Sequence, residues 1–230
     1  MKIKHLLIPL LAIIFYGCSK NIEYTQEFKD KTAGRYLYSL DEAIEVSFDS
    51  NNKLQVTWRG ADMRPIAIDE NTFTSVEMNK KLRFMTHPET KVRYITDVTE
   101  DDKKIAYDYK RMPDTFNVPS AYLKNKEYDK ALVGYLNIQK EDSTSIYIRE
   151  RDFNRFGYKL IREKKYEDAI KVLKINVALY PESDNVYDSL ADAYTRNGDS
   201  LEAYNNYKKA LEFNSGNKRA KRFVEAYEKK

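Results

Sequence analysis

The chain has few of the residues on which compact catalytic and metal sites usually depend. Its 230 residues include one cysteine, two histidines, seven glycines and six prolines. One cysteine cannot build an internal disulfide framework or a cysteine-based zinc site, since both require several thiols. Seven scattered glycines also provide no glycine-rich loop of the kind that cradles phosphate groups. We therefore predict a protein without a bound metal or cofactor.

The chain also lacks a strong charge of either sign. Its net charge is +4, from 40 Lys+Arg against 36 Asp+Glu. The basic residues are interleaved with acidic ones, whereas nucleic-acid-binding proteins gather them on one face or in one block. Aromatic residues are plentiful instead, with 19 Tyr and 10 Phe. We expect an aromatic-rich globular protein, long enough for one large or two small domains, that binds no nucleic acid.

The first residues have the pattern of an export signal. Met1–Lys4 is short and basic, and an apolar run follows over Leu6–Tyr16. At about 1.5 Å per residue this run spans roughly half of the hydrocarbon core of a bilayer, so it is too short for a transmembrane helix. We predict a signal peptide over residues 1–17.

The only cysteine of the chain stands where the apolar run ends, in Gly17-Cys18. A small residue followed by cysteine at this place resembles the lipobox of bacterial lipoproteins. The resemblance implies that Cys18 carries acyl chains such as palmitate, that a tether follows over residues 18–30, and that the protein is anchored in the bacterial cell envelope, at the outer membrane. A stray thiol in an ordinary signal peptide is the alternative.

Histidine-dependent catalysis has little support in the sequence. Once the signal peptide is removed, His87 is the only histidine, and it lies in a stretch, His87-Pro88-Glu89-Thr90, that is typical of a turn. A nucleophile needs an adjacent base to activate it. We predict that His87 is a surface residue and that the protein is not an enzyme.

Residues 31–111 have the pattern of an antiparallel β domain. Apolar and polar side chains alternate over Ile44–Phe48 and Leu54–Trp58, which is the period of a strand. Shorter runs of this kind are Thr72–Met78, Lys81–Met85, Val92–Ile95 and Ile105–Tyr109. The turns between them are too short for crossover helices, so we expect about six or seven antiparallel strands in a small barrel or sandwich.

Several short motifs in this segment are similar to those of a known domain. They are Gly34-Arg35-Tyr36, Asn52-Lys53-Leu54, Trp58-Arg59-Gly60 and Pro65-Ile66. With them the segment resembles the small β domain that accompanies tetratricopeptide (TPR) modules in bacterial lipoproteins and in penicillin-binding-type serine hydrolases. The hydrolases' Ser-x-x-Lys spacing also occurs, at Ser50–Lys53 and Ser215–Lys218, but both lie in polar turn-like stretches without a partner motif, so we expect no hydrolase activity.

Trp58, Arg59 and Arg64 lie close together in the sequence of the β domain. An open barrel mouth with two arginines could hold an acidic small molecule. The alternative is a core tryptophan flanked by solvated arginines, and we favour this second interpretation.

A repeat of 34 residues runs through the C-terminal half of the chain. A shift of 34 residues places Gly157 on Ala191 and Ala169 on Ala203. Larger side chains coincide as well: Phe153 with Tyr187, Phe156 with Leu190, Leu160 with Tyr194 and Leu173 with Tyr207. This is the TPR period, in which small residues let the two helices of a unit touch.

One further unit precedes these repeats and a single helix follows them. A shift of 38 residues places Tyr122 on Leu160 and Ala131 on Ala169. After Gly216, apolar residues recur at helical spacing while basic residues, Arg219 among them, cover the other side. We therefore expect about three helical hairpins and a C-terminal capping helix over residues 117–230.

Four longer motifs make the TPR resemblance more specific. They are Asn154–Tyr158, Asn176-Val177, Tyr180–Ser183 and Asn185–Leu190. With them Tyr122–Tyr227 resembles one particular bacterial TPR module. The resemblance implies stacked hairpins whose first helices line a concave groove, and a protein or peptide as the partner.

Carried over position by position, the resemblance also implies which side chains line the groove. These residues are Arg151, Asn154, Arg155, Tyr158, Arg162, Asp188, Asp192 and Arg196. Forked guanidinium groups suit carboxylates, which favours a partner with acidic groups. The alternative is structural: Asn154 and Asp188 could bond between helices, and the arginines could be merely solvated.

The fold class that follows is α+β, with an N-terminal antiparallel β domain before an all-α TPR solenoid. The expected function is that of a lipid-anchored, non-catalytic protein–protein interaction module of the cell envelope. Two other functions remain open. The β domain could bind a small ligand or glycan, or the chain could be an accessory component of an envelope hydrolase system.

Overall fold

A computed structural model describes residues 22–99 and 105–229 of the chain. The predicted signal peptide and Cys18 lie outside the described residues. Contacts divide the chain into two compact units. The first comprises the chain up to Tyr36 together with Ile44–Arg111, and the second comprises Leu37–Ala43 together with Met112–Lys230. In the described part of the chain, no helix is both long and apolar enough to cross a membrane.

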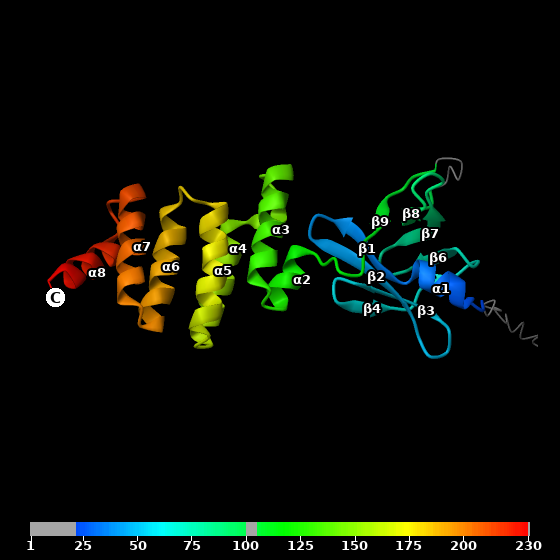
Figure 1. The fold of residues 1–230 in the computed structure, drawn as a ribbon, viewed down its shortest axis with the longest axis horizontal. Helices are drawn as coiled ribbons and strands as arrows, with labels where there is room; N and C mark the ends of the chain where they lie inside the picture. The colour runs from blue at the N-terminus through cyan, green and yellow to red at the C-terminus, as the bar shows by residue number, and fades with distance from the viewer. Residues whose placement is uncertain (1–21, 100–104, 230) are drawn as a thin grey trace, which may run out of the picture. The chain divides into compact units, whose positions relative to one another are not determined.

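The first unit is built on an antiparallel β-sheet (Figure 1). Its nine strands, counted over the described residues, lie in the order β4-β3-β2-β1-β9-β8-β7-β6-β5. The strands are β1 (Gly34–Ser39), β2 (Glu42–Phe48), β3 (Leu54–Trp58), β4 (Ala61–Met63), β5 (Ile66–Ala67), β6 (Thr72–Ser75), β7 (Lys80–Thr86), β8 (Arg93–Asp97) and β9 (Tyr109–Arg111). Pairing is antiparallel from β2 to β4 and from β5 to β9.

The sheet is curled, because a very short connection joins its two edge strands. β4 ends at Met63 and β5 begins at Ile66, so only Arg64 and Pro65 link opposite edges of the sheet. Three peptide steps reach at most about 11 Å, which forces the edges together. Across this junction, Ser75 Oγ lies 3.5 Å from Met63 Sδ. The predicted antiparallel sheet is confirmed, and of the barrel and the sandwich that the sequence left open the curled sheet resembles the barrel; the predicted number of six or seven strands was too low.

A short helix, α1 (Gln26–Thr32), lies in the segment for which the sequence predicted a tether. Thr25 caps it, since its Oγ1 accepts a hydrogen bond of 3.1 Å from the Phe28 amide. The Phe28 ring stacks on Tyr24 at 5.1 Å and meets the ring of Phe84 at 6.1 Å. From Ile22 onward this segment is thus a packed part of the first unit, because its aromatic side chains cover the sheet interior.

The second unit consists mainly of helices that pack in sequence order (Figure 1). They are α2 (Pro119–Lys124), α3 (Tyr128–Glu141), the 3₁₀ turn η1 (Ile146–Ile148), α4 (Glu150–Arg162), α5 (Tyr166–Leu179), α6 (Asp184–Asn197), α7 (Ser200–Phe213) and α8 (Lys218–Glu228). Successive pairs α2–α3, α4–α5 and α6–α7 form hairpins, and α8 packs on α7. The last two hairpins begin and end 34 residues apart, so the predicted helical-repeat fold is confirmed by the helices themselves.

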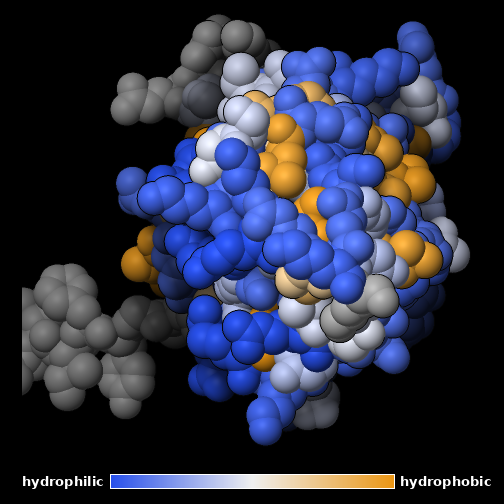
Figure 2. Space-filling model, turned by 90° about the vertical axis from the view of Figure 1, so that its left-hand side faces the viewer, coloured by the Kyte–Doolittle hydropathy of each residue, from blue (hydrophilic) through white to orange (hydrophobic). Residues whose placement is uncertain are grey.

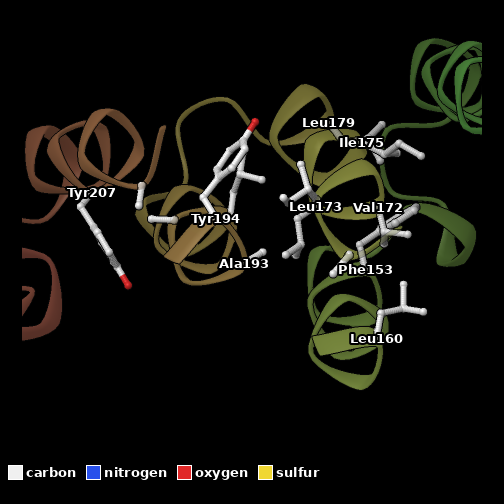
Figure 3. Packing of buried hydrophobic residues seen from close by; sticks show 14 of the residues in the cluster. Phe153, Leu160, Val172, Leu173, Ile175, Leu179, Ala193, Tyr194 and Tyr207 are labelled. Atoms are coloured by element: carbon white, nitrogen blue, oxygen red, sulfur yellow. The ribbon is translucent and has the colours of Figure 1, made fainter. Parts of the chain in front are cut away.

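Small residues allow the two helices of each hairpin to approach. A Cβ atom added at Gly157 of α4 would lie 2.6 Å from Cγ of Leu173 on α5. Ala169, Ala191 and Ala203 are fully buried at the other contacts. Figure 3 shows the larger side chains that fill the space between hairpins, Leu173 and Tyr194 among them.

Different elements cover the two ends of the helical unit. At the C-terminal end, α8 buries Ala220 and Val224 and exposes most of its charged side chains, such as Lys221 and Arg222. Figure 2, which looks onto that end, shows a mainly hydrophilic surface.

At the N-terminal end, the segment Leu37–Ala43, which is the turn between β1 and β2 with the adjoining strand ends, belongs to the helical unit. Leu40 packs against the helical core, and Asp41 Oδ1 accepts a hydrogen bond of 2.7 Å from the Ser120 amide at the start of α2. The Tyr147 hydroxyl lies 2.8 Å from Ser39 Oγ and 3.1 Å from Glu42 Oε1.

Candidate peptide-binding groove

The predicted groove residues lie on the first helices of two successive hairpins. Those on α4 are Arg151, Asn154, Arg155, Tyr158 and Arg162, and those on α6 are Asp188, Asp192 and Arg196. The two helices contact each other. The structure therefore brings the two sets together on neighbouring helices, as the repeat register requires.

A guanidinium group from the capping helix links these two helices. Arg219 of α8 donates from Nε to Asp188 Oδ1 at 3.1 Å and from Nη2 to the Tyr158 hydroxyl at 3.1 Å. Its Nη2 also donates to Asp188 Oδ2, and its Nη1 lies 3.6 Å from Asp192 Oδ2. Asn217 adds a hydrogen bond of 2.9 Å to Asp188 Oδ1. Arg219 is thus the centre of a polar network that joins α4, α6 and α8.

The network favours the charged form of Arg219. Burial by itself would lower the pKa of Arg219, but hydrogen bonds to Asp188 and Tyr158 outweigh burial and raise it. Asp188 is only 8 % exposed, and a buried carboxylate needs such a forked, charged partner. The carboxylate of Asp188 is therefore neutralised within the protein and is not available to a ligand.

The repeat register of the sequence also indicates the position of Arg219. Steps of 34 residues lead from Arg151 to Asn185 and from there to Arg219. The capping helix therefore presents Arg219 at a groove position of the repeat, although its basic residues were assigned to the solvent-facing side. In the structure, Arg219 faces Asp188 and Tyr158, two of the predicted groove residues.

Asn154, like Asp188, is buried and forms a hydrogen bond between helices. It is 8 % exposed, and its Oδ1 accepts a hydrogen bond of 3.0 Å from Nδ2 of Asn176 on α5. The same Nδ2 donates to the Glu150 carbonyl at 3.0 Å. Asn154 and Asp188 therefore make the contacts between helices that the structural interpretation assigned to them.

The arginines of the groove remain accessible. The side chains of Arg151, Arg155 and Arg196 are 74 %, 75 % and 60 % exposed. Arg155 bonds to Asp152 on its own helix at 2.7 Å, and Arg196 lies 3.5 Å from Asp192. Arg162 is exposed as well. Because Asp188 is buried and bonded to Arg219, the accessible charged groups of this surface are mainly guanidinium groups.

His87 occupies a turn in the β unit. Its Nδ1 accepts hydrogen bonds of 3.3 Å from the amides of Glu89 and Thr90, and its ring lies 4.7 Å from that of Tyr107. Within the residues that the structure describes, no group of three or more His, Cys, Asp or Glu is placed to hold a metal ion.

The β unit contains a cavity of about 430 Å³. Tyr24, Leu54, Arg64 and Ile66 are among its lining residues. Trp58 and Arg59 are not among the described residues that line it; the Arg59 guanidinium instead lies 4.4 Å from the centre of the Trp58 ring. The structure therefore separates Arg64 from the tryptophan with which the sequence had grouped it.

No protein-family model and no curated protein matches the chain. Among solved structures, the first TPR of Spaghetti (RPAP3) bound to an HSP90 peptide is similar at 21 % identity, over 48 % of this chain and 85 % of that chain, with a TM-score of 0.34. The Sgt2 TPR domain from Aspergillus fumigatus is similar at 20 % identity, over 48 % and 72 % of the two chains, with a TM-score of 0.34. A point mutant of MamA is similar at 20 % identity, over 48 % and 79 %, with a TM-score of 0.37.

Proposed function

We propose that this protein is a non-catalytic interaction module, anchored by lipid in the bacterial cell envelope, whose helical repeats bind an acidic segment of a partner protein. The binding surface is the groove lined by α4 and α6. One observation carries the proposal: exposed guanidinium groups line α4, while the buried carboxylate of Asp188 on the facing helix is already neutralised by Arg219.

The spacing of the arginines suits an extended acidic segment. Arg151, Arg155 and Arg162 follow one another at intervals of one and two helical turns, so they share one face of α4. Each guanidinium can donate two parallel hydrogen bonds to a carboxylate. Tyr158, between them, adds a rigid ring that contributes contact area at small entropic cost.

Replacement of Arg155 by glutamate tests this proposal. Arg155 bonds only within its own helix among the described residues, so Arg155→Glu should leave the fold intact. Proteins that the wild-type chain retains from a membrane extract should be lost with Arg155→Glu and kept with Lys171→Glu, which changes an exposed cation on α5 outside the groove. For an acidic partner we expect about tenfold weaker binding at low salt. Retention of the same proteins by Arg155→Glu would contradict the proposal.

The lipid anchor is a separate part of the proposal and rests on Gly17-Cys18 after the apolar run. Multiple acyl chains give stable membrane attachment, because each buried methylene contributes about 0.8 kcal/mol. An inhibitor of lipoprotein signal peptidase should therefore cause an unprocessed precursor to accumulate. Unchanged processing in its presence would exclude the anchor without affecting the groove.

A second candidate function follows from the cavity of the β unit. A volume of about 430 Å³ with Lys53 and Arg64 at its wall suits a small acidic ligand or a glycan. Binding of such a ligand should be weakened by Arg64→Ala and unchanged by Arg155→Glu. A role as an accessory component of an envelope hydrolase system is a third proposal, which the genomic neighbourhood would test.

A further inference from the structure

A second groove lies at the N-terminal end of the helical unit, along α3. It has a volume of about 580 Å³, within the range of protein binding pockets. Its apolar lining comes from α2, α3 and the turn before β2, and includes Leu40, Pro119, Tyr122, Val133 and Ile138. It is formed by other residues than the groove of α4 and α6.

Comparison of α3 with α5 indicates which kind of element packs on this face of α3. A shift of 38 residues pairs Gly134 with Val172, Asn137 with Ile175 and Glu141 with Leu179. The three residues on α5 are at most 2 % exposed, because α5 packs against the preceding hairpin. Figure 3 shows them together on one side of α5. On α3 the equivalent residues line the open groove. The groove is therefore the site at which an earlier helix would stack.

The surface beside the groove is apolar where later repeats are polar. Val133 is 60 % exposed and Leu136 is 38 % exposed. Their equivalents are Lys171 and Lys174 on α5 and Asn205 and Lys208 on α7, all of them exposed. The same helix position is thus polar in two hairpins and apolar in the first, which marks an interaction surface.

Charges at the two ends of the groove define its occupant more closely. Asp129 and Glu141 both line it, and the twelve residue steps from one to the other correspond to about 18 Å along the helix. Neither forms an ion pair with a described residue, whereas Lys130, which lines the groove next to Asp129, is paired with Glu127 at 2.5 Å. The groove is apolar in the middle and acidic at both ends.

We propose that this groove binds an amphipathic helix of a partner protein, with an apolar ridge along α3 and a basic residue near each end. The partner helix takes the place that a preceding repeat helix would take, as α3 does on α5. Its basic residues face Asp129 and Glu141, which selects cationic over anionic helices. This site is independent of the groove formed by α4 and α6.

The test uses the full chain and two labelled helical peptides of about fourteen residues. Both carry leucine at i, i+3, i+7 and i+10, and they differ in having lysine or glutamate at both ends. Fluorescence anisotropy should show binding of the lysine peptide about tenfold or more tighter than that of the glutamate peptide at low salt. Asp129→Lys combined with Glu141→Lys should reverse this preference.

Two surface variants distinguish binding in the groove from non-specific hydrophobic binding elsewhere on the surface. Val133→Glu should weaken binding of the lysine peptide about tenfold or more, whereas Leu201→Glu on α7, where Leu201 is 57 % exposed, should change it less than about twofold. Equal affinities for the two peptides, no binding of either, or equal effects of the two variants would overturn the proposal. A full-length dimer that Val133→Glu dissociates would also overturn it, because a second copy would then cover the groove.

Discussion

Asp188 and Arg155 occupy neighbouring helices of one surface but have opposite roles. Asp188 is buried and bonded to Arg219 and Asn217, so it holds helices together. Arg155 is 75 % exposed and, among the described residues, bonds only to Asp152 on the same helix. This surface therefore combines a buried, bonded frame with an accessible set of hydrogen-bond donors.

Removal of the Arg219 side chain should destabilise the helical unit. Arg219→Ala leaves the buried carboxylate of Asp188 with Asn217 as its remaining side-chain donor. Because Arg219 is 41 % exposed, water can replace part of the interaction, and we expect a loss of about 1–3 kcal/mol in the free energy of unfolding. Urea unfolding followed by circular dichroism measures it. Arg222→Ala, at an exposed position of the same helix, is the control and should cost less than about 0.5 kcal/mol.

Asp41 should make stability depend on pH in an unusual direction. Burial raises its pKa to about 6, although the Ser120 amide hydrogen bond partly counteracts burial. An aspartate in an unfolded chain has a pKa near 3.9, so the folded state binds this proton more tightly. The contribution of Asp41 to stability therefore increases as pH falls from about 7 to about 4, by roughly 2–3 kcal/mol.

The Asp41→Asn variant isolates this effect from the other carboxylates. Asparagine can still accept the Ser120 hydrogen bond but does not titrate, so the stability difference between variant and wild type should shrink as the pH is lowered. Urea titrations at pH 7 and at pH 4.5 measure it. A difference that stays constant between the two pH values would show that Asp41 titrates normally.

At the scale of helices and strands, close approach between α4 and α5 depends on the absence of a side chain at Gly157. Valine at this position would place its Cβ 2.6 Å from Cγ of Leu173, which is fully buried, so the surrounding core would have to shift. Gly157→Val should therefore cost about 2–3 kcal/mol, measured as a lower urea midpoint. Ala178→Val, at an exposed position of α5, is the matched control and should cost about 0.5 kcal/mol. Equal effects would mean that the hairpin tolerates a wider spacing.

Helices that belong to the 34-residue repeat were predictable from sequence. Elements that depend on contacts between residues far apart in the chain were not. The 34-residue spacing located α4 to α7, because each repeat uses small residues at the same inter-helix contacts. β4 and β5 have three and two residues, which is too short for alternation to show. α1 was missed, since Phe28 within it and Tyr24 just before it pack on aromatic rings of strands that come later in the chain.

The helices that carry the predicted groove residues were predictable, but the bonds among those residues were not. The repeat register placed Arg155 and Asp188 on the correct helices, because that register is local. The pairing of Asp188 with Arg219 depends on how α6 and α8 pack, 31 residues apart in the chain. The acidic-ended groove on α3 depends likewise on the return of the turn around Leu40.

At the scale of the whole molecule, the second unit is discontinuous in sequence. Its core includes Leu40 from the turn Leu37–Ala43, while its helices begin only at Pro119. A fragment that starts at residue 112 lacks Leu40 and the carboxylate of Asp41 that bonds to α2. We expect its helical melting temperature, followed at 222 nm, to lie several degrees below that of the full chain. Leu40→Ala in the full chain should lower it in the same direction, and an unchanged value for both would show that the turn contributes nothing to the unit.

The discontinuity also affects how the chain is made. Asp41 precedes Ser120 by 79 residues, so the turn is synthesised well before the helix that it stabilises. At about 5–20 residues per second, the ribosome adds the intervening segment in roughly 4–16 s. During that interval Leu40 has no helical core to pack against. In a continuous repeat array, each new helix can pack on the one synthesised just before it. Here the segment Leu37–Ala43 is synthesised first and can pack on its helices only after translation has reached α2.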